Sequence, residues 1–143
     1  MCSRTRTQAE KEKIMAVHLD SIANLYAALA RGDVPAVLAA LPPDIIWTTA
    51  EGFPYGGTYV GPDAVLQNIL AKLGSEWHGF AVVPHEYIAS SDTAVALGEY
   101  SGTYKATGKS FKAPFVHIWK FDEDRIISFN QHTDTAVVQR VLQ

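Results

Sequence analysis

Four long strand-like runs fill the second half of the sequence, and they restrict the possible folds more than any other feature. They cover residues 78–89, 93–105, 111–121 and 125–133. The breaks between them are short and rich in turn-forming residues such as Ser, Asp and Gly. Strands joined by connections this short pair as consecutive antiparallel neighbours. The second half of the chain therefore predicts an antiparallel meander.

The first half is dominated by helical signals. Helical spacing of apolar residues, with caps and breakers at the ends, predicts helices over 14–31, 33–41 and 62–73. A strand is expected over 44–51, followed by a turn-rich stretch, and a short terminal helix over 136–142. Because helices come first and strands later, the predicted fold class is α+β, with the helices covering one face of a curved sheet.

The charged residues 1–13 are interpreted as a flexible N-terminal arm or as the exposed start of the first helix. Residues 14–143 then form a single domain, because a chain of 143 residues has the usual size of one. With 48% hydrophobic residues and a formal net charge of −3, disorder is excluded as the main state.

Composition also excludes several kinds of partner. No apolar run approaches the roughly 18 residues that a membrane span needs, so no membrane partner is expected. The excess of acidic over basic residues argues against nucleic acid as a partner. The lone Cys2 can form no internal disulfide, and the opening residues lack the apolar core of a secretory signal. We therefore expect a cytoplasmic location.

Several segments in order resemble the SnoaL-like polyketide cyclase and ketosteroid isomerase-related branch of the nuclear transport factor 2-like superfamily. The resemblance covers most of residues 14–140 and is carried by 25–33, 53–65, 115–119 and 131–135. It implies a cystatin-like cone, in which a strongly bent sheet wraps around a long first helix and encloses a deep, mostly apolar pocket. It also implies a homodimer formed through the outer face of the sheet.

Strand alternation and this resemblance together select the residues that would line the pocket. Side chains two apart in a strand share a face, which groups Trp47, Thr49 and Glu51. The same rule groups His117 with Trp119, and the resemblance places both groups inside the cone. If the strand 93–105 has its small side chains inward, a sizeable ligand has room beside Ala94, Ala96, Gly98 and Tyr100. The residues expected to contact a substrate are Tyr26, Trp47, Thr49, Tyr59, Trp119, Phe129 and Gln131.

The sequence departs from ketosteroid isomerases at the positions that resemble their catalytic groups. Those enzymes use an Asp base with an oxyanion hole made by a Tyr and a protonated Asp. Here Thr49 stands at the position resembling the base, Leu25 at that of the first-helix tyrosine, and His117 at that of the protonated Asp. Steroid isomerisation by that set of groups is not expected.

The candidate catalytic residues are His117, Asp134 and Glu51. SnoaL-like members use a cavity His and a C-terminal Asp for acid–base work, and His117 and Asp134 match those positions. A histidine titrates near neutrality, and a nearby carboxylate could fix its tautomer. Each residue also has a structural interpretation: a core histidine, the N-cap of the terminal helix, and a solvated carboxylate at a loop.

Two functions follow as expectations. The first is an isomerase, cyclase or dehydratase that works without a cofactor or metal on an apolar, carbonyl-bearing ligand, with Tyr59 or Tyr26 as hydroxyl donor. It predicts that His117 lies within reach of a carboxyl group. The second is a non-catalytic module that binds an apolar ligand or serves for dimerisation. The histidines show no spacing typical of a metal site.

Overall fold

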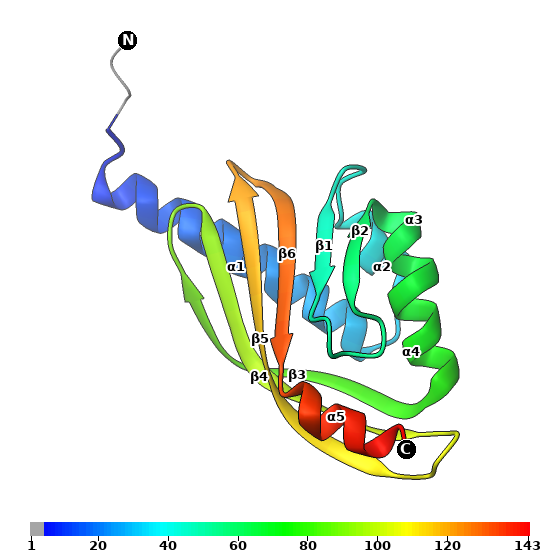
Figure 1. Ribbon diagram of the computed structural model, residues 1–143. Coiled ribbons are helices and arrows are strands. Elements are labelled where there is room, and N and C mark those ends of the chain that lie inside the picture. The colour runs from blue at the N-terminus through cyan, green and yellow to red at the C-terminus, as the bar shows by residue number, and fades with distance from the viewer. Residues whose placement is uncertain (1–4) are drawn as a thin grey trace.

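A computed structural model describes residues 5–143, and it places the long first helix across one face of a curved six-stranded sheet (Figure 1). The strands lie in the order β2-β1-β6-β5-β4-β3. The predicted meander is confirmed, each boundary within about one residue: β3 Trp77–Ala89, β4 Thr93–Tyr104, β5 Ser110–Asp122 and β6 Arg125–Thr133. All its neighbours pair antiparallel.

Two short strands from the first half complete the sheet. The predicted early strand is β1, Ile46–Thr49, and it pairs parallel with β6, so that Trp47 lies beside Phe129. The turn-rich stretch after it contains β2, Gly57–Val60, which the sequence analysis did not predict. Strands of four residues carry too few alternating positions to be recognised among glycines. The sheet is therefore mixed: β1 and β6 pair parallel, and the other neighbouring strands pair antiparallel.

The first helix, α1, spans Gln8–Ala30 and begins at a capping box. The Thr7 hydroxyl accepts from the Glu10 amide at 3.1 Å, and the Glu10 carboxylate accepts from the Thr7 amide at 3.3 Å. Residues 8–13 of the predicted arm are therefore helical. This agrees with the second interpretation of the arm, as the exposed start of the first helix. Residues 1–4 of that arm lie outside the described residues.

The buried face of α1 differs slightly from the predicted stripe. Val17, counted there as apolar core, is 38% exposed, whereas the neighbouring His18 is fully buried. Ile22, Leu25 and Tyr26 are buried as predicted. The face that meets the sheet is therefore rotated by about one residue at the start of the helix.

The remaining helices close the open side of the sheet. Gly32, at φ +70°, ends α1, and the Asp33 carboxylate caps α2, Val34–Ala39, by accepting from the Ala36 amide at 3.2 Å. The predicted helix from Pro62 is one continuous rod made of α3 Pro62–Val65, a π-helical turn η1 Leu66–Leu70 and α4 Ala71–Glu76. It continues past Gly74, where an end was predicted. The terminal helix α5 is Thr135–Val141.

Gly98 lies where β4 comes too close to its neighbours to carry a side chain. A Cβ atom there would lie 2.2 Å from the Val83 carbonyl oxygen and 2.5 Å from the Phe115 ring. The β3–β4 register shifts between Pro84 and Glu86, next to the residue paired with Gly98. The glycine thus serves the close approach of two strands rather than ligand space. None of the helices within residues 5–143 has the length and apolar character needed to cross a membrane.

Candidate functional site

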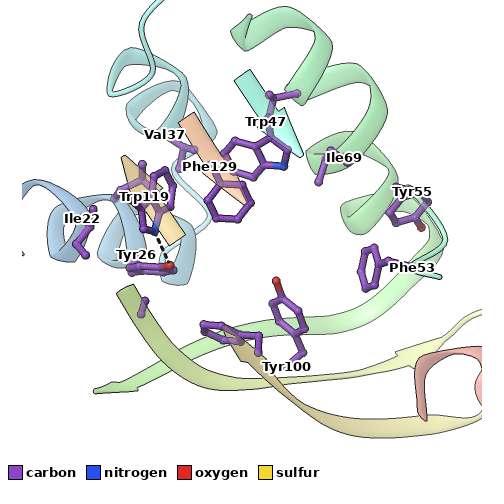
Figure 2. Packing of buried hydrophobic residues seen from close by; sticks show 14 of the residues in the cluster. Ile22, Tyr26, Val37, Trp47, Phe53, Tyr55, Ile69, Tyr100, Trp119 and Phe129 are labelled. Carbon is purple, nitrogen blue, oxygen red and sulfur yellow. Dashed lines mark hydrogen bonds between the residues drawn. The ribbon is translucent and has the colours of Figure 1, made fainter. Parts of the chain in front are cut away.

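A small cavity lies inside the cone, between the end of α1, the sheet and the rod α3–η1–α4. It has a volume of about 50 Å³, far below the several hundred Å³ of typical ligand pockets. Large aromatic side chains surround it, among them Tyr26, Trp47, Phe53, Tyr100, Trp119 and Phe129 (Figure 2). The cavity is lined by Tyr26, Leu29, Trp47, Thr49, Phe53, Ile69, Leu70, Leu73, Phe80, Val82, Tyr100, His117, Trp119, Phe129 and Gln131. No charged side chain is among these residues.

A wider vestibule of about 390 Å³ adjoins this cavity. It lies between the end of α1, the start of α2, the rod and the first half of β3, and it shares five apolar lining residues with the cavity: Leu29, Leu70, Leu73, Phe80 and Val82. The π-helical turn borders both spaces, and such turns frequently occur at functional sites. Together the two spaces could hold a ligand whose polar end reaches the inner wall.

The inner wall is organised around His117 on β5, which is 3% exposed. Its Nδ1 shares a hydrogen bond of 2.6 Å with the Tyr26 hydroxyl from α1. Its Nε2 shares a short hydrogen bond with the Tyr100 hydroxyl from β4. The ring also stacks on Phe115, with the ring centroids 4.0 Å apart. Both imidazole nitrogens are therefore held by phenolic hydroxyls.

Each of these hydroxyls also accepts a hydrogen bond from a fixed donor. The Trp119 indole Nε1–H donates to the Tyr26 oxygen at 3.0 Å (Figure 2). At the other end, the Gln131 Nε2–H donates to the Tyr100 oxygen at 3.0 Å. The result is a hydrogen-bonded chain that crosses from the first helix to three strands.

Burial keeps Tyr26, His117 and Tyr100, the ionisable members of this hydrogen-bonded series, uncharged near pH 7. It lowers the pKa of His117 to about 3, with a smaller contribution from His132, so the imidazole is neutral near pH 7. Burial raises the pKa of both Tyr26 and Tyr100, so both phenols stay protonated. His117 is therefore not the near-neutral titrating group that the sequence analysis expected. A neutral imidazole between two phenols can pass a proton on only as it receives another.

Most of the predicted binding residues meet at this cavity. Strand alternation and the resemblance together predicted Trp47, Thr49, Trp119, Phe129 and Gln131 as pocket residues, and all five line the cavity. The aromatic members pack on each other, with the Trp47 and Phe129 ring centroids 3.9 Å apart. The wall is thus both the hydrophobic core and the cavity lining.

Three predicted site residues lie elsewhere. Glu51 and Asp134 are exposed, and neither lines the cavity. The Asp134 carboxylate accepts from the Val137 amide at 3.4 Å and thus caps α5. Tyr59 donates its hydroxyl to the Tyr55 carbonyl oxygen at 2.9 Å. Among the described residues, the partners of His117 are phenols in place of the predicted carboxyl group.

Tyr100 was expected beside the ligand only if strand 93–105 turns its small side chains inward, and it was not counted among the catalytic or substrate-contacting residues. Its signal was present, because alternation along β4 puts it on the same face as Ala94 and Ala96, and all three are buried. Tyr26, predicted as a substrate contact and hydroxyl donor, lines the cavity, whereas the adjacent Leu25, at the position resembling the first-helix tyrosine of ketosteroid isomerases, does not. A one-residue shift on a helix moves a side chain to a different face.

Comparisons with known proteins agree with this architecture. The sequence profile of the SnoaL-like domain matches residues 22–129. An NTF2-like protein from Burkholderia thailandensis E264 is 40% identical, with a TM-score of 0.84 over 87% of this chain and 95% of that chain. An NTF2-like protein of unknown function from Burkholderia pseudomallei K96243 is 33% identical, with a TM-score of 0.81 over 89% and 98%.

A more distant similarity shows the fold alone. TerC, co-crystallised with polyporic acid, is 24% identical, with a TM-score of 0.79 over 88% of this chain and 98% of that chain. No curated protein matches the chain.

Proposed function

This chain belongs to the SnoaL-like domain family, and from that premise we propose that it is a small-molecule enzyme of the isomerase, cyclase or dehydratase type. It acts without a cofactor on a mostly apolar ligand that carries a carbonyl group, bound in the cavity and its vestibule. The observation that carries this proposal is the buried, neutral histidine with a tyrosine hydroxyl on each ring nitrogen.

The proposed chemistry is proton transfer through His117. One tyrosine donates its O–H to the ligand oxygen, and the imidazole N–H re-protonates that tyrosine. At the same time the other tyrosine gives its proton to the second ring nitrogen and takes a proton from the ligand carbon next to the carbonyl. One C–H bond breaks and one O–H bond forms on the ligand, so a ketone becomes its enol. The triad ends with the same number of protons and no charge.

A mostly apolar, aromatic wall favours such a neutral route. Charged intermediates are costly in a cavity that has no charged side chain. Transfers along preformed hydrogen bonds need little reorganisation, because the donors and acceptors already lie at bonding distance. Asp134 and Glu51, proposed from the sequence, have no part in this route, since both are exposed.

The test is deuterium exchange at the α-carbon of acetophenone in D2O, followed by NMR. We expect the protein to accelerate exchange over buffer, and His117→Gln to lose this acceleration. His132→Asn is the matched control, since His132 lies on the neighbouring strand β6 but is exposed. Its exchange rate should equal that of the unaltered protein. Binding of acetophenone without faster exchange would contradict the enzymatic proposal.

One observation favours the alternative of a non-catalytic binding module. No carboxylate lines the cavity, so a strong base for removing a carbon-bound proton is missing among the described lining residues. This alternative predicts a rise in melting temperature with apolar ligands. Polyporic acid, the compound co-crystallised with TerC, is a suitable further probe. Turnover of any bound compound would exclude the non-catalytic binding module.

We also propose that the protein is a cytoplasmic homodimer that pairs through the outer face of the sheet. The location rests on the single Cys2. The outer face carries apolar side chains, among which Val83 and Ile88 on β3 are 47% and 52% exposed. Burial of such side chains against a second subunit stabilises a dimer. Light scattering at micromolar concentration tests it, and a monomeric mass would contradict it.

A further inference from the structure

The triad of Tyr26, His117 and Tyr100 holds one more proton than its internal hydrogen bonds use. Each phenol carries one proton, and a neutral imidazole carries one. The triad contains two internal hydrogen bonds, one at each ring nitrogen. Three protons and two bonds leave one proton without a partner inside the triad, whichever way the bonds are directed.

The flanking residues cannot take up this extra proton. The Trp119 indole has only a donor to offer to Tyr26. The Gln131 carbonyl oxygen is occupied by the Ala50 amide at 3.2 Å, which turns its NH2 group toward Tyr100. Both flanking groups therefore donate to the tyrosines. The extra proton must be an O–H of whichever tyrosine accepts from the imidazole N–H.

We propose that this extra O–H recognises the ligand, that the site selects a neutral, apolar molecule with one carbonyl oxygen, and that binding fixes the tautomer of His117. This inference rests on the proposed function and names its substrate class and its ligand-binding group. A buried O–H without an acceptor is unfavourable, so a carbonyl oxygen that reaches it gains a hydrogen bond with little competing desolvation. Both hydroxyl-bearing residues line the cavity.

The lining argues against a charged ligand. A carboxylate would have to give up its hydration for a single O–H donor, with no cationic side chain nearby. An apolar ring system can instead occupy the vestibule, which is walled by Leu29, Leu70 and Leu73. The selectivity expected is therefore ketone over hydrocarbon and over carboxylate.

The coupling to the histidine follows from the bond directions. If the ligand accepts from Tyr100, the Nε2–H of His117 must donate to Tyr100, and the Tyr26 hydroxyl must donate to Nδ1. If the ligand accepts from Tyr26, both directions reverse and the proton lies on Nδ1. Other donors at the cavity, the Thr49 hydroxyl and the second N–H of Gln131, would bind a carbonyl without selecting a tautomer.

The first part of the experiment compares three ligands of similar size on the unaltered protein: acetophenone, ethylbenzene and benzoate. Ethylbenzene is the most apolar, so hydrophobic burial alone would favour it. We expect acetophenone to bind at least about tenfold more tightly than ethylbenzene, the effect of one buried hydrogen bond. We expect no binding of benzoate. Thr49→Val tests the rival hydroxyl donor at the cavity, and loss of the preference for acetophenone in this variant would overturn the assignment of the donor to the tyrosines.

The second part follows the two ¹⁵N resonances of His117, assigned through its backbone signals, during the same titrations. Acetophenone should drive one nitrogen to a protonated shift and the other to an unprotonated one, whereas ethylbenzene should leave their populations unchanged. Equal affinity for ketone and hydrocarbon, or ketone binding without a change in the ¹⁵N shifts, would overturn this inference and leave the proposed function standing. Failure of every ligand to bind would overturn both.

Discussion

Two histidines are buried in this fold, and their surroundings differ. His117 on β5 is hydrogen-bonded through both ring nitrogens to tyrosine hydroxyls. His18 on α1 is fully buried, and its Nε2–H donates to the Glu123 carbonyl oxygen at 2.5 Å in the β5–β6 turn. Its ring stacks on Phe121 at 3.9 Å between centroids, and its Nδ1 has no hydrogen-bond partner within residues 5–143.

The difference separates a chemical role from a packing role. A carbonyl oxygen can only accept, so the proton of His18 is fixed on Nε2 and Nδ1 stays an unpaired acceptor. Hydroxyls can donate or accept, so the proton of His117 can lie on either nitrogen. His18 therefore packs the β5–β6 turn against α1. The hydroxyl partners of His117, in contrast, permit its proton to move between the two nitrogens.

The largest expected effect is the dependence of stability on pH through His117. Burial lowers its folded-state pKa to about 3, whereas an unfolded histidine titrates near 6.5. Between these values the unfolded chain binds a proton that the folded chain does not. The contribution of His117 to the free energy of unfolding is therefore fully present above about pH 6.5. It falls as the pH drops, by about 1.4 kcal/mol per pH unit and by about 5 kcal/mol in total between the unfolded and the folded pKa.

Urea unfolding of the unaltered protein and of His117→Leu, measured from pH 7 to pH 4, checks this expectation. The two curves of unfolding free energy should converge as the pH falls, because the variant lacks the titrating group. Parallel curves would show that His117 does not carry a lowered pKa.

The next largest effect is expected from His117→Leu at pH 7. The substitution removes the hydrogen-bond partner that His117 gives to each of the buried Tyr26 and Tyr100 hydroxyls, so we expect a loss of about 3 kcal/mol in unfolding free energy. His132→Leu, at an exposed position of β6, should change stability by less than about 0.5 kcal/mol. A loss of similar size in both variants would break the assignment of His117 to a buried network.

Much of the fold could be predicted from the sequence, because local patterns determine it. The four long strands span nine or more residues each, so their positions could be predicted, and the alternation is clearest along β5, where buried and more exposed residues alternate throughout. The same rule grouped Trp47 with Thr49, and the resemblance to SnoaL-like proteins placed this group and His117 on the inner wall. The rule fails once a strand ends: β1 stops at Thr49, so Glu51 no longer follows the alternation, and Asp134, proposed from the resemblance, lies just past the end of β6.

The hydrogen-bonded triad could not be predicted in the same way. Tyr26 and His117 are far apart in the sequence and meet only because α1 crosses the sheet at one particular place. A shift of one residue along the helix would present Leu25 instead. The depressed pKa likewise depends on complete burial, which no local pattern reveals. Long-range packing therefore decides the chemistry of the site.

A smaller effect is expected from removing one phenolic hydroxyl. Tyr26→Phe leaves the Trp119 N–H without an acceptor, and Tyr100→Phe does the same to Gln131, so each should cost about 1–2 kcal/mol. Urea unfolding at pH 7 measures both losses. Tyr59→Phe is the matched control, because its hydroxyl bonds only backbone carbonyl oxygens away from the triad. Triad variants no less stable than this control would contradict the proposed network.

The smallest effect is expected from His18→Phe, which keeps a planar ring on Phe121 and removes the unpaired Nδ1. The Glu123 carbonyl lies in an exposed turn and can accept from water instead. Loss of a hydrogen bond and removal of a buried unpaired atom should nearly cancel, giving a change below about 1 kcal/mol in unfolding free energy. His18→Ala, which removes the ring, should cost about 2–4 kcal/mol. If the phenylalanine variant instead lost as much as the alanine variant, the nitrogens of His18 would matter as those of His117 do, and the contrast between the two histidines would fail.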